Sequence, residues 1–346
     1  MKRIILIILV LLSTSLWCQQ YQRSAEIVAP FLQISPDARG MAMGNTGVAA
    51  KPNVFSMYYN PARYSFIEDK TTIGAGLRHC TMSYNLYDLS VAQKIGKIST
   101  LAVSFRYCLY KEINYRGDQN EDLGSYKPKE YAIDLSYSIK LGEHFSAAVA
   151  GHYIHSALFD PNLIRYSKIA HDFAFDGGAY YTHEMNLGEF AGNYSFGLSL
   201  TNLGGKTGYR RYSDYYSIYE SAAYHEDFKD IDFLPTTVSI GGGADLSKGK
   251  NSFALNFDLS KIIVPKFSTY NMNLGVGLEY GRDVKDYTFF VRAGYYNMPS
   301  IFGNINNYTM GVGAKILDFD IDFACNISTN TGSFYDYLMT TIKFGF

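Results

Sequence analysis

The chain has 346 residues, of which 47% are hydrophobic and 16% aromatic, with 31 Tyr and 23 Phe among them. Its formal net charge of −1 offers no surplus of basic residues to neutralise phosphates, which excludes nucleic acid as a partner. The aromatic content favours β-strands and the two interfaces of a lipid bilayer, where tyrosine rings lie at headgroup level.

A secretory signal peptide is predicted over residues 1–18. Lys2 and Arg3 supply its positive start, and an apolar core leads to cleavage after Cys18. Cys18 would also suit a lipoprotein, but the bulky Trp17 is a poor residue before a lipidated cysteine. Removal of the signal leaves 29 basic residues against 32 acidic ones.

No apolar run of helical membrane-spanning length follows the signal. The mature chain is therefore either soluble in the periplasm or spans a membrane as a closed barrel, because only helices and closed barrels satisfy their backbone groups in lipid. Cys80, Cys108 and Cys325 form no C-x-x-C pair and no disulfide framework. They are expected to be small apolar fillers on strands.

Residues 19–69 are neither strand-like nor an obvious linker. An apolar, weakly helical stretch over 25–32 is followed by turn-rich sequence containing Pro36, Gly40 and Gly44. This segment is predicted to be a hatch or plug inside a barrel lumen, or a periplasmic extension.

Residues 70–346 show apolar side chains at every second position, the period of a half-buried strand. In residues 131–141, for example, Tyr131, Ile133 and Leu135 alternate with Ala132, Asp134 and Ser136. A soluble sandwich would share this period, but here the polar positions include charges that suit a water-filled lumen, with the apolar face turned to lipid. About 14 strands are predicted, at 71–80, 84–95, 98–110, 131–141, 145–155, 172–183, 194–203, 236–246, 253–260, 272–281, 287–296, 308–316, 319–327 and 337–346.

The connections support a transmembrane antiparallel β-barrel. Those after even-numbered strands are mostly short, and those after odd-numbered strands are mostly long, except the first. Short periplasmic turns alternating with long external loops are typical of outer-membrane barrels, and an even strand count puts both barrel ends on the periplasmic side. The chain also ends on Phe346, preceded by Phe344 and Ile342 at alternate positions, which resembles an outer-membrane assembly signal.

Two runs near the N-terminus carry a family resemblance. The runs FLQISPDARGMAMGNTGVA from Phe31 to Ala49 and NPARYSF from Asn60 to Phe66 resemble the start of the PorV family, outer-membrane components of the Bacteroidetes type IX secretion system. The step Asn60-Pro61-Ala62 also resembles the wider family of FadL-like fatty-acid channels, which are 14-stranded barrels with an N-terminal hatch. Ser199 to Gly204 is similar to a strand-end motif of that family.

The resemblance implies a non-catalytic role in the outer membrane of a Gram-negative bacterium of the Bacteroidetes. A PorV-like barrel would contact lipid and lipopolysaccharide, associate with the large translocon barrel SprA (also called Sov), bind cargo by its C-terminal signal domain, and deliver it to the complex of the PorU sortase. Chemistry would then belong to PorU. A PorQ-like paralogue and a FadL-like channel for hydrophobic small molecules stay open as alternatives, as does a surface enzyme such as a barrel lipase.

Two external loops are the predicted partner-binding sites. The loop 204–235 is rich in Tyr and Arg, residue types that dominate binding hot spots, and the loop 261–270 presents aliphatic side chains that need a covering surface. The alternative is a loop folded over the barrel mouth or packed on lipopolysaccharide. The proposed contact residues are Tyr209, Arg210, Arg211, Tyr212, Tyr215, Tyr216, Tyr219, Ile262, Ile263, Val264 and Phe267.

No catalytic, cofactor-binding or metal-binding residue is predicted. Asp118 to Lys129 fits a calcium loop poorly, because Leu123 and Lys129 occupy the positions of its Gly and Glu. His152 and His155 lie three apart on a strand and so face opposite sides. The charged positions Asp134, Asp258, Asp320, Asp322 and Arg292 are expected to form a lumenal network.

Overall fold

The computed structural model describes residues 29–80, 84–116, 120–158, 169–207, 232–263, 272–300, 303–328 and 337–346. Predicted contact residues 209–219, Val264 and Phe267 lie outside them, as does the signal peptide. Within the described residues, no helix is long and apolar enough to cross a membrane.

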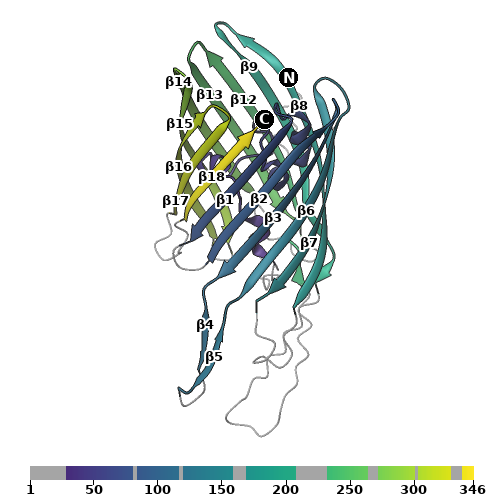
Figure 1. Cartoon of the computed structure of the whole chain (residues 1–346), viewed down its shortest axis with the longest axis vertical. Helices are drawn as coiled ribbons and strands as arrows, with labels where there is room; N and C mark the ends of the chain where they lie inside the picture. The colour runs from purple at the N-terminus through teal and green to yellow at the C-terminus, as the bar shows by residue number, and fades with distance from the viewer. Residues whose placement is uncertain are drawn as a thin grey trace.

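Fourteen antiparallel strands close into one barrel, which confirms the fold expected from the alternation (Figure 1). Closure occurs where β1 pairs with β18, so every barrel strand has two neighbours. The strands are β1 (Thr71–Cys80), β2 (Tyr84–Ile95), β3 (Ser99–Tyr110), β6 (Lys129–Lys140), β7 (Phe145–Ala157), β8 (Ala170–Leu187), β9 (Phe190–Gly204), β12 (Thr237–Lys248), β13 (Asn251–Ile262), β14 (Asn273–Val284), β15 (Tyr287–Ser300), β16 (Gly303–Ile316), β17 (Phe319–Ser328) and β18 (Tyr337–Gly345).

The outer wall carries the large apolar side chains. Leu135, Val149 and Phe175 are among those more than half exposed to the surroundings of the barrel, while their strand neighbours face inward. Aromatic rings gather near the strand ends, as in the stack of Phe319 on Phe344 and the contact of Tyr131 with Tyr153. An apolar band between aromatic girdles is the pattern of a barrel in lipid.

The two barrel ends differ in their connections. At one end, here the short-turn end, two-residue turns join β8–β9, β12–β13, β14–β15 and β16–β17, and their first residues Gly188, Gly249, Lys285 and Leu317 have φ between 55° and 62°. Such values suit tight hairpins, whose twist matches that of the strands. At the other end, the long-loop end, the hairpin of β4 (Ile113–Arg116) and β5 (Asp122–Tyr126) extends beyond the barrel (Figure 1), and β10 (Lys206–Thr207) pairs with β11 (Asp232–Phe233).

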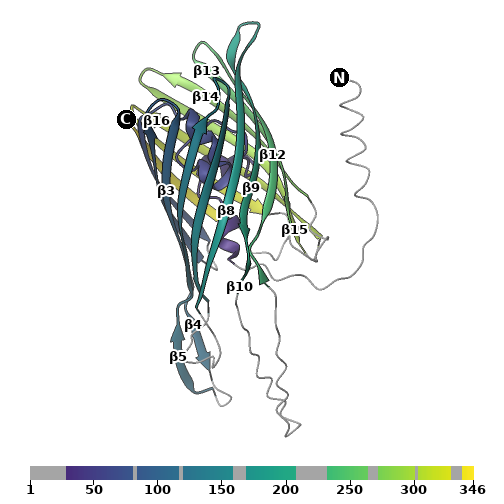
Figure 2. The same ribbon diagram turned by 90° about the vertical axis from the view of Figure 1, so that its right-hand side faces the viewer.

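Residues 29–69, here the lumenal segment, run inside the barrel (Figure 2). They form the short helices η1 (Pro30–Gln33), α2 (Ala38–Ala42), α3 (Ser56–Tyr59) and η2 (Pro61–Phe66). The largest fully buried side chains include Phe31, Phe55, Arg63 and Tyr64 from this segment. The core of the molecule is therefore the contact between this segment and the inner wall.

Candidate functional site

Glycines on the inner wall define the path of the lumenal segment. A Cβ atom on Gly197 would overlap the Val48 carbonyl, and one on Gly277 would overlap the Met43 carbonyl. A Cβ atom on each of seven further wall glycines would come within 3.0 Å of a backbone or side-chain atom of the lumenal segment; these are Gly74, Gly178, Gly241, Gly243, Gly275, Gly294 and Gly311. Glycine in a strand interior is the residue that allows another backbone to approach closely. The wall is therefore shaped for residues 42–62.

Polar side chains of the wall bind the backbone of this segment. The Asp258 carboxylate accepts hydrogen bonds from the N–H groups of Gly47 (2.6 Å) and Val48 (2.9 Å). Thr309 accepts from the N–H of Gly44 and donates to the carbonyl of Ala42, each at 3.0 Å. Since buried backbone groups need partners, these bonds replace the water that would otherwise solvate the segment.

Asn60 and Arg63 hold the segment together from within. The Asn60 amide donates to the carbonyls of Val48 (3.0 Å) and Ala179 (2.9 Å), and its oxygen caps η2 by accepting from the N–H of Ala62. Arg63 is 1% exposed and donates to the carbonyls of Gly47, Ala50 and Lys51. The Asn-Pro-Ala motif thus has a structural role, which the family resemblance alone did not specify.

Four of the five charged positions expected to form a lumenal network lie in two separate networks, whereas Asp258 binds backbone N–H groups instead. In one, Arg106 donates to Asp134, whose Oδ1 lies 2.6 Å from His152 Nδ1. His152 Nε2 in turn lies 2.9 Å from the Asp176 carboxylate, so the imidazole is held between two acids. Such buried charges are tolerated because each has an opposite partner.

The second network lies toward the short-turn end. Arg292 bridges Glu279 and Asp322, and Lys343 Nζ lies 2.9 Å from Asp322 and 3.7 Å from Asp320. Arg39 of the lumenal segment adds two bonds of 2.9 Å to Glu279. This network lines a charged vestibule of about 860 Å³ at the short-turn end.

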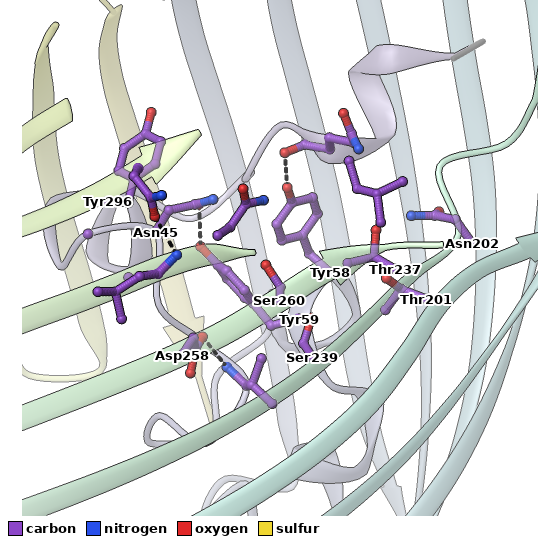
Figure 3. Close-up of a pocket in the computed structure, with 18 of the residues that line it drawn as sticks. Asn45, Tyr58, Tyr59, Thr201, Asn202, Thr237, Ser239, Asp258, Ser260 and Tyr296 are labelled. Carbon is purple, nitrogen blue, oxygen red and sulfur yellow. Dashed lines mark hydrogen bonds between the residues drawn. The ribbon is translucent and has the colours of Figure 1, made fainter. Parts of the chain in front are cut away.

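A smaller cavity of about 230 Å³ lies toward the long-loop end (Figure 3). The lumenal segment contributes Asn45, Tyr58 and Tyr59, and strands β9 and β12 to β15 contribute mostly hydroxyl and amide side chains. Burial raises the pKa values of the Tyr58 and Tyr59 phenols, so both stay neutral donors. Tyr59 shares a 2.5 Å hydrogen bond with Ser35.

A β-bulge shapes the rim of this cavity. Pairing between β8 and β9 shifts register between Phe175 and Gly177, and Asn202 has a φ of 56°. As a result the consecutive residues Thr201 and Asn202 are both buried and both line the cavity, whereas a regular strand would turn one outward. Asp176 holds the bulge by accepting the Asn202 N–H at 2.7 Å.

Comparison with known protein families shows which family the chain belongs to. A model of the type IX secretion system protein PorV matches residues 17–269. This chain belongs to the PorV family. No curated protein matches it. The family and the barrel fold place this PorV-family chain in the outer membrane.

Solved structures share the fold at low identity. The toluene transporter TodX of Pseudomonas putida matches with a TM-score of 0.55 and 11% identity, over 89% of this chain and 98% of that one. The monoaromatic hydrocarbon channel CymD matches with a TM-score of 0.50 and 10% identity, over 90% and 97%. A FadL homologue of Pseudomonas aeruginosa matches with a TM-score of 0.48 and 11% identity, over 90% and 99%. The likenesses to TodX and CymD show the fold of the PorV-family barrel and nothing of its cargo.

One predicted contact residue is placed differently from expectation. Ile262 was expected to be exposed on an external loop, but it is the last residue of β13, 8% exposed, and lines the cavity. That expectation was wrong because β13 continues beyond the strand predicted at 253–260, so Ile262 keeps the inward face of the alternation. Ile263, the next residue, is 50% exposed.

His152 and His155 point to opposite faces of their strand, as their spacing predicted. His152 faces the lumen, whereas His155 stacks on Tyr131 and contacts His171 on the next strand. In the part of the chain that the structure describes, no group of three His, Cys, Asp or Glu residues could hold a metal ion. Within the described residues, Cys80, Cys108 and Cys325 form no disulfide.

Proposed function

We propose that this chain is the PorV-like component of type IX secretion that binds the C-terminal signal domain of cargo at the SprA/Sov translocon and carries it to the PorU attachment complex. The observation that carries the proposal is the family match over residues 17–269. In this proposal the protein is non-catalytic and PorU supplies the chemistry. The signal peptide 1–18, the hatch segment 19–69 and the barrel 70–346 are its three parts.

The occupied lumen supports a role outside the barrel rather than as a conduit. Residues 29–69 pack across the lumen between the short-turn vestibule of about 860 Å³ and the long-loop cavity of about 230 Å³, and the latter is smaller than a typical pocket for a drug-sized molecule. A folded signal domain could not pass through it. The partner surfaces we propose are therefore loops at the long-loop end, among them Tyr209, Arg210, Arg211, Tyr212, Tyr215, Tyr216, Tyr219, Ile263, Val264 and Phe267.

The difference between the two barrel ends supports an orientation. Bacterial outer-membrane barrels have short turns in the periplasm and longer loops outside. We infer that the short-turn end, where the barrel begins at Thr71 and ends at Gly345, faces the periplasm of a Bacteroidetes cell. The β4–β5 hairpin and the predicted contact loops then lie on the outside, where secreted cargo emerges.

The second candidate is a FadL-like channel for hydrophobic small molecules, favoured by the fold shared with TodX and CymD. A channel of this kind needs an apolar path. The cavity toward the long-loop end is lined by eight Ser, Thr and Asn residues among aliphatic and Tyr side chains, and an apolar ligand would leave these polar groups without partners. The secretion role is therefore preferred.

Affinity purification of the tagged full-length protein from native outer membrane tests the proposal. We expect SprA/Sov, cargo bearing the C-terminal signal domain, and PorU-complex members to co-purify, and deletion of the gene to leave cargo unattached in the periplasm. Normal secretion in the deletion strain, together with lost uptake of hydrophobic compounds, would support the channel instead.

A further inference from the structure

The cavity at the long-loop end has one wall built as a polar row. The strand pairing sets Ser199 opposite Ser239, Ser239 opposite Ser260, and Ser260 opposite Asn273. Neighbouring strands lie about 4.8 Å apart, so these side chains form a ladder across β9, β12, β13 and β14. Ser239, Ser260 and Asn273 line the cavity.

Hydrogen-bonding capacity in this row is left open. Asn273 lines the cavity, and its buried Oδ1 has no hydrogen-bond partner among the described residues. The Oγ of Ser199, in the same row but not among the residues that line the cavity, has none either. Buried polar atoms of folded proteins are nearly always paired, and each exception needs an explanation. A bound molecule that forms several hydrogen bonds with these atoms would explain why they lack protein partners.

The bulge in β9 adds to this capacity. It turns both Thr201 and Asn202 toward the cavity, next to the row, where a regular strand would offer only one side chain. The lumenal segment closes the opposite side with Asn45 and the neutral phenols of Tyr58 and Tyr59 (Figure 3). The site therefore presents hydroxyl and amide side chains from the barrel strands and from the lumenal segment.

Charge and polarity limit the class of ligand. Among the described residues that line the cavity there is no Lys, Arg or His, and Asp258 is the only acid. An anionic ligand would lie near the Asp258 carboxylate with no cationic side chain to balance its charge. An apolar ligand would leave the hydroxyl and amide groups without hydrogen-bond partners. A neutral molecule with many hydroxyl groups satisfies both restrictions.

The cavity volume limits the size. A volume of about 230 Å³ equals roughly seven to eight waters at about 30 Å³ each. This suits one sugar ring rather than a chain of them. We propose that this cavity is a binding site for a neutral, hydroxyl-rich small molecule of the size of a single hexose. This site is separate from the cargo contacts proposed above.

Binding is tested on the full-length protein purified in detergent, by saturation-transfer NMR with glucose, galactose and N-acetylglucosamine. Glucuronate tests the charge restriction, and toluene tests the apolar alternative. We expect binding of at least one neutral sugar and weaker or no binding of glucuronate and toluene. No neutral sugar bound, or toluene bound in preference, would overturn the proposal and leave a water-filled cavity or a hydrocarbon site.

Variants locate the binding. Ser260→Leu fills the cavity and is expected to abolish sugar binding, and Asn273→Ala is expected to weaken it about tenfold, as for the loss of one hydrogen bond to a buried partner. Ser252→Leu is the matched control, because Ser252 lies on the same strand but lines the short-turn vestibule. Heat-dependent gel migration checks that each variant is folded. Sugar binding that survives in folded Ser260→Leu protein would refute the assignment, whatever the outcome of the secretion assays.

Discussion

Asn60 offers the sharpest test of how the lumenal segment is held. In Asn60→Ala the two carbonyls of Val48 and Ala179 lose their donor, and the N–H of Ala62 loses its cap. Asn60 itself is 0% exposed, so water does not readily replace the lost groups. The barrel strands keep their own pairing, because none of these bonds belongs to the closed ladder.

The magnitude follows from the three lost bonds. Loss of an N-cap costs about 1 kcal/mol, and the buried Val48 carbonyl left without its donor costs about 1–3 kcal/mol. The Ala179 carbonyl keeps its strand partner and loses a second bond worth about 1 kcal/mol. We therefore expect the free energy of opening of residues 42–67 to fall by roughly 3 kcal/mol, with the strands unaffected. Since about 1.4 kcal/mol is a factor of ten, amide exchange in the segment should accelerate about 100-fold.

Hydrogen exchange read by mass spectrometry measures this effect in the detergent-solubilised protein. The informative amides are those of Gly44, Gly47 and Val48, which donate to wall side chains. Lys51→Ala is the control, because the Lys51 side chain is 59% exposed and its ion pair with Glu68 contributes little. If exchange in residues 42–67 of Asn60→Ala matched the wild-type rate, the anchoring role of this motif would be refuted.

Three further predictions concern the wall, its charges and a turn. Gly197→Ala should loosen the lumenal segment by about 1–3 kcal/mol through overlap with a backbone carbonyl, whereas Gly177→Ala, whose Cβ meets nothing within 4 Å, should not; limited proteolysis distinguishes them. Asp134→Ala should lower the unfolding free energy by about 3–5 kcal/mol in urea titrations, because it leaves Arg106 buried without its acid. Leu317→Gly should raise the unfolding free energy by up to about 1 kcal/mol, because Leu317 has a φ of 55° that favours glycine. A urea midpoint equal to or lower than that of the wild type would count against that reasoning.

The strands were largely predictable because lipid imposes a simple rule on them. All 14 barrel strands fall where the period of two places them, with ends shifted by a few residues. The two largest differences are at the β15–β16 hairpin, where β15 continues to Ser300 and β16 begins at Gly303, and at the β8–β9 hairpin, where β8 continues to Leu187 and a two-residue turn begins at Gly188. The signal was present as a Gly in a tight turn, but polar residues such as Glu184 concealed the alternation around it.

The path of the lumenal segment was not predictable from its own sequence. Its residues show no strand or helix period, since their contacts are with a wall assembled from distant strands. Asp258 lies 210 positions from Val48, for example, and reads in the sequence as one more lumenal charge. The wall glycines were a usable signal: glycines recurring on the inward face, such as Gly241 and Gly243, mark close backbone approach rather than weak strands.

The contacts between the lumenal segment and the wall bear on whether the lumen can open for transport. If the segment were a gate that opens for transport, it would be expected to meet the wall through few and weak contacts, as mobile elements do. Here it is anchored by Asp258, Thr309 and Glu279 on three different strands, and small residues of the wall fit its backbone closely. Opening would expose these buried groups together, so its free energy should approach that of a cooperative folding unit. A barrel closed in this way fits the proposed role, in which cargo is bound at the rims and loops.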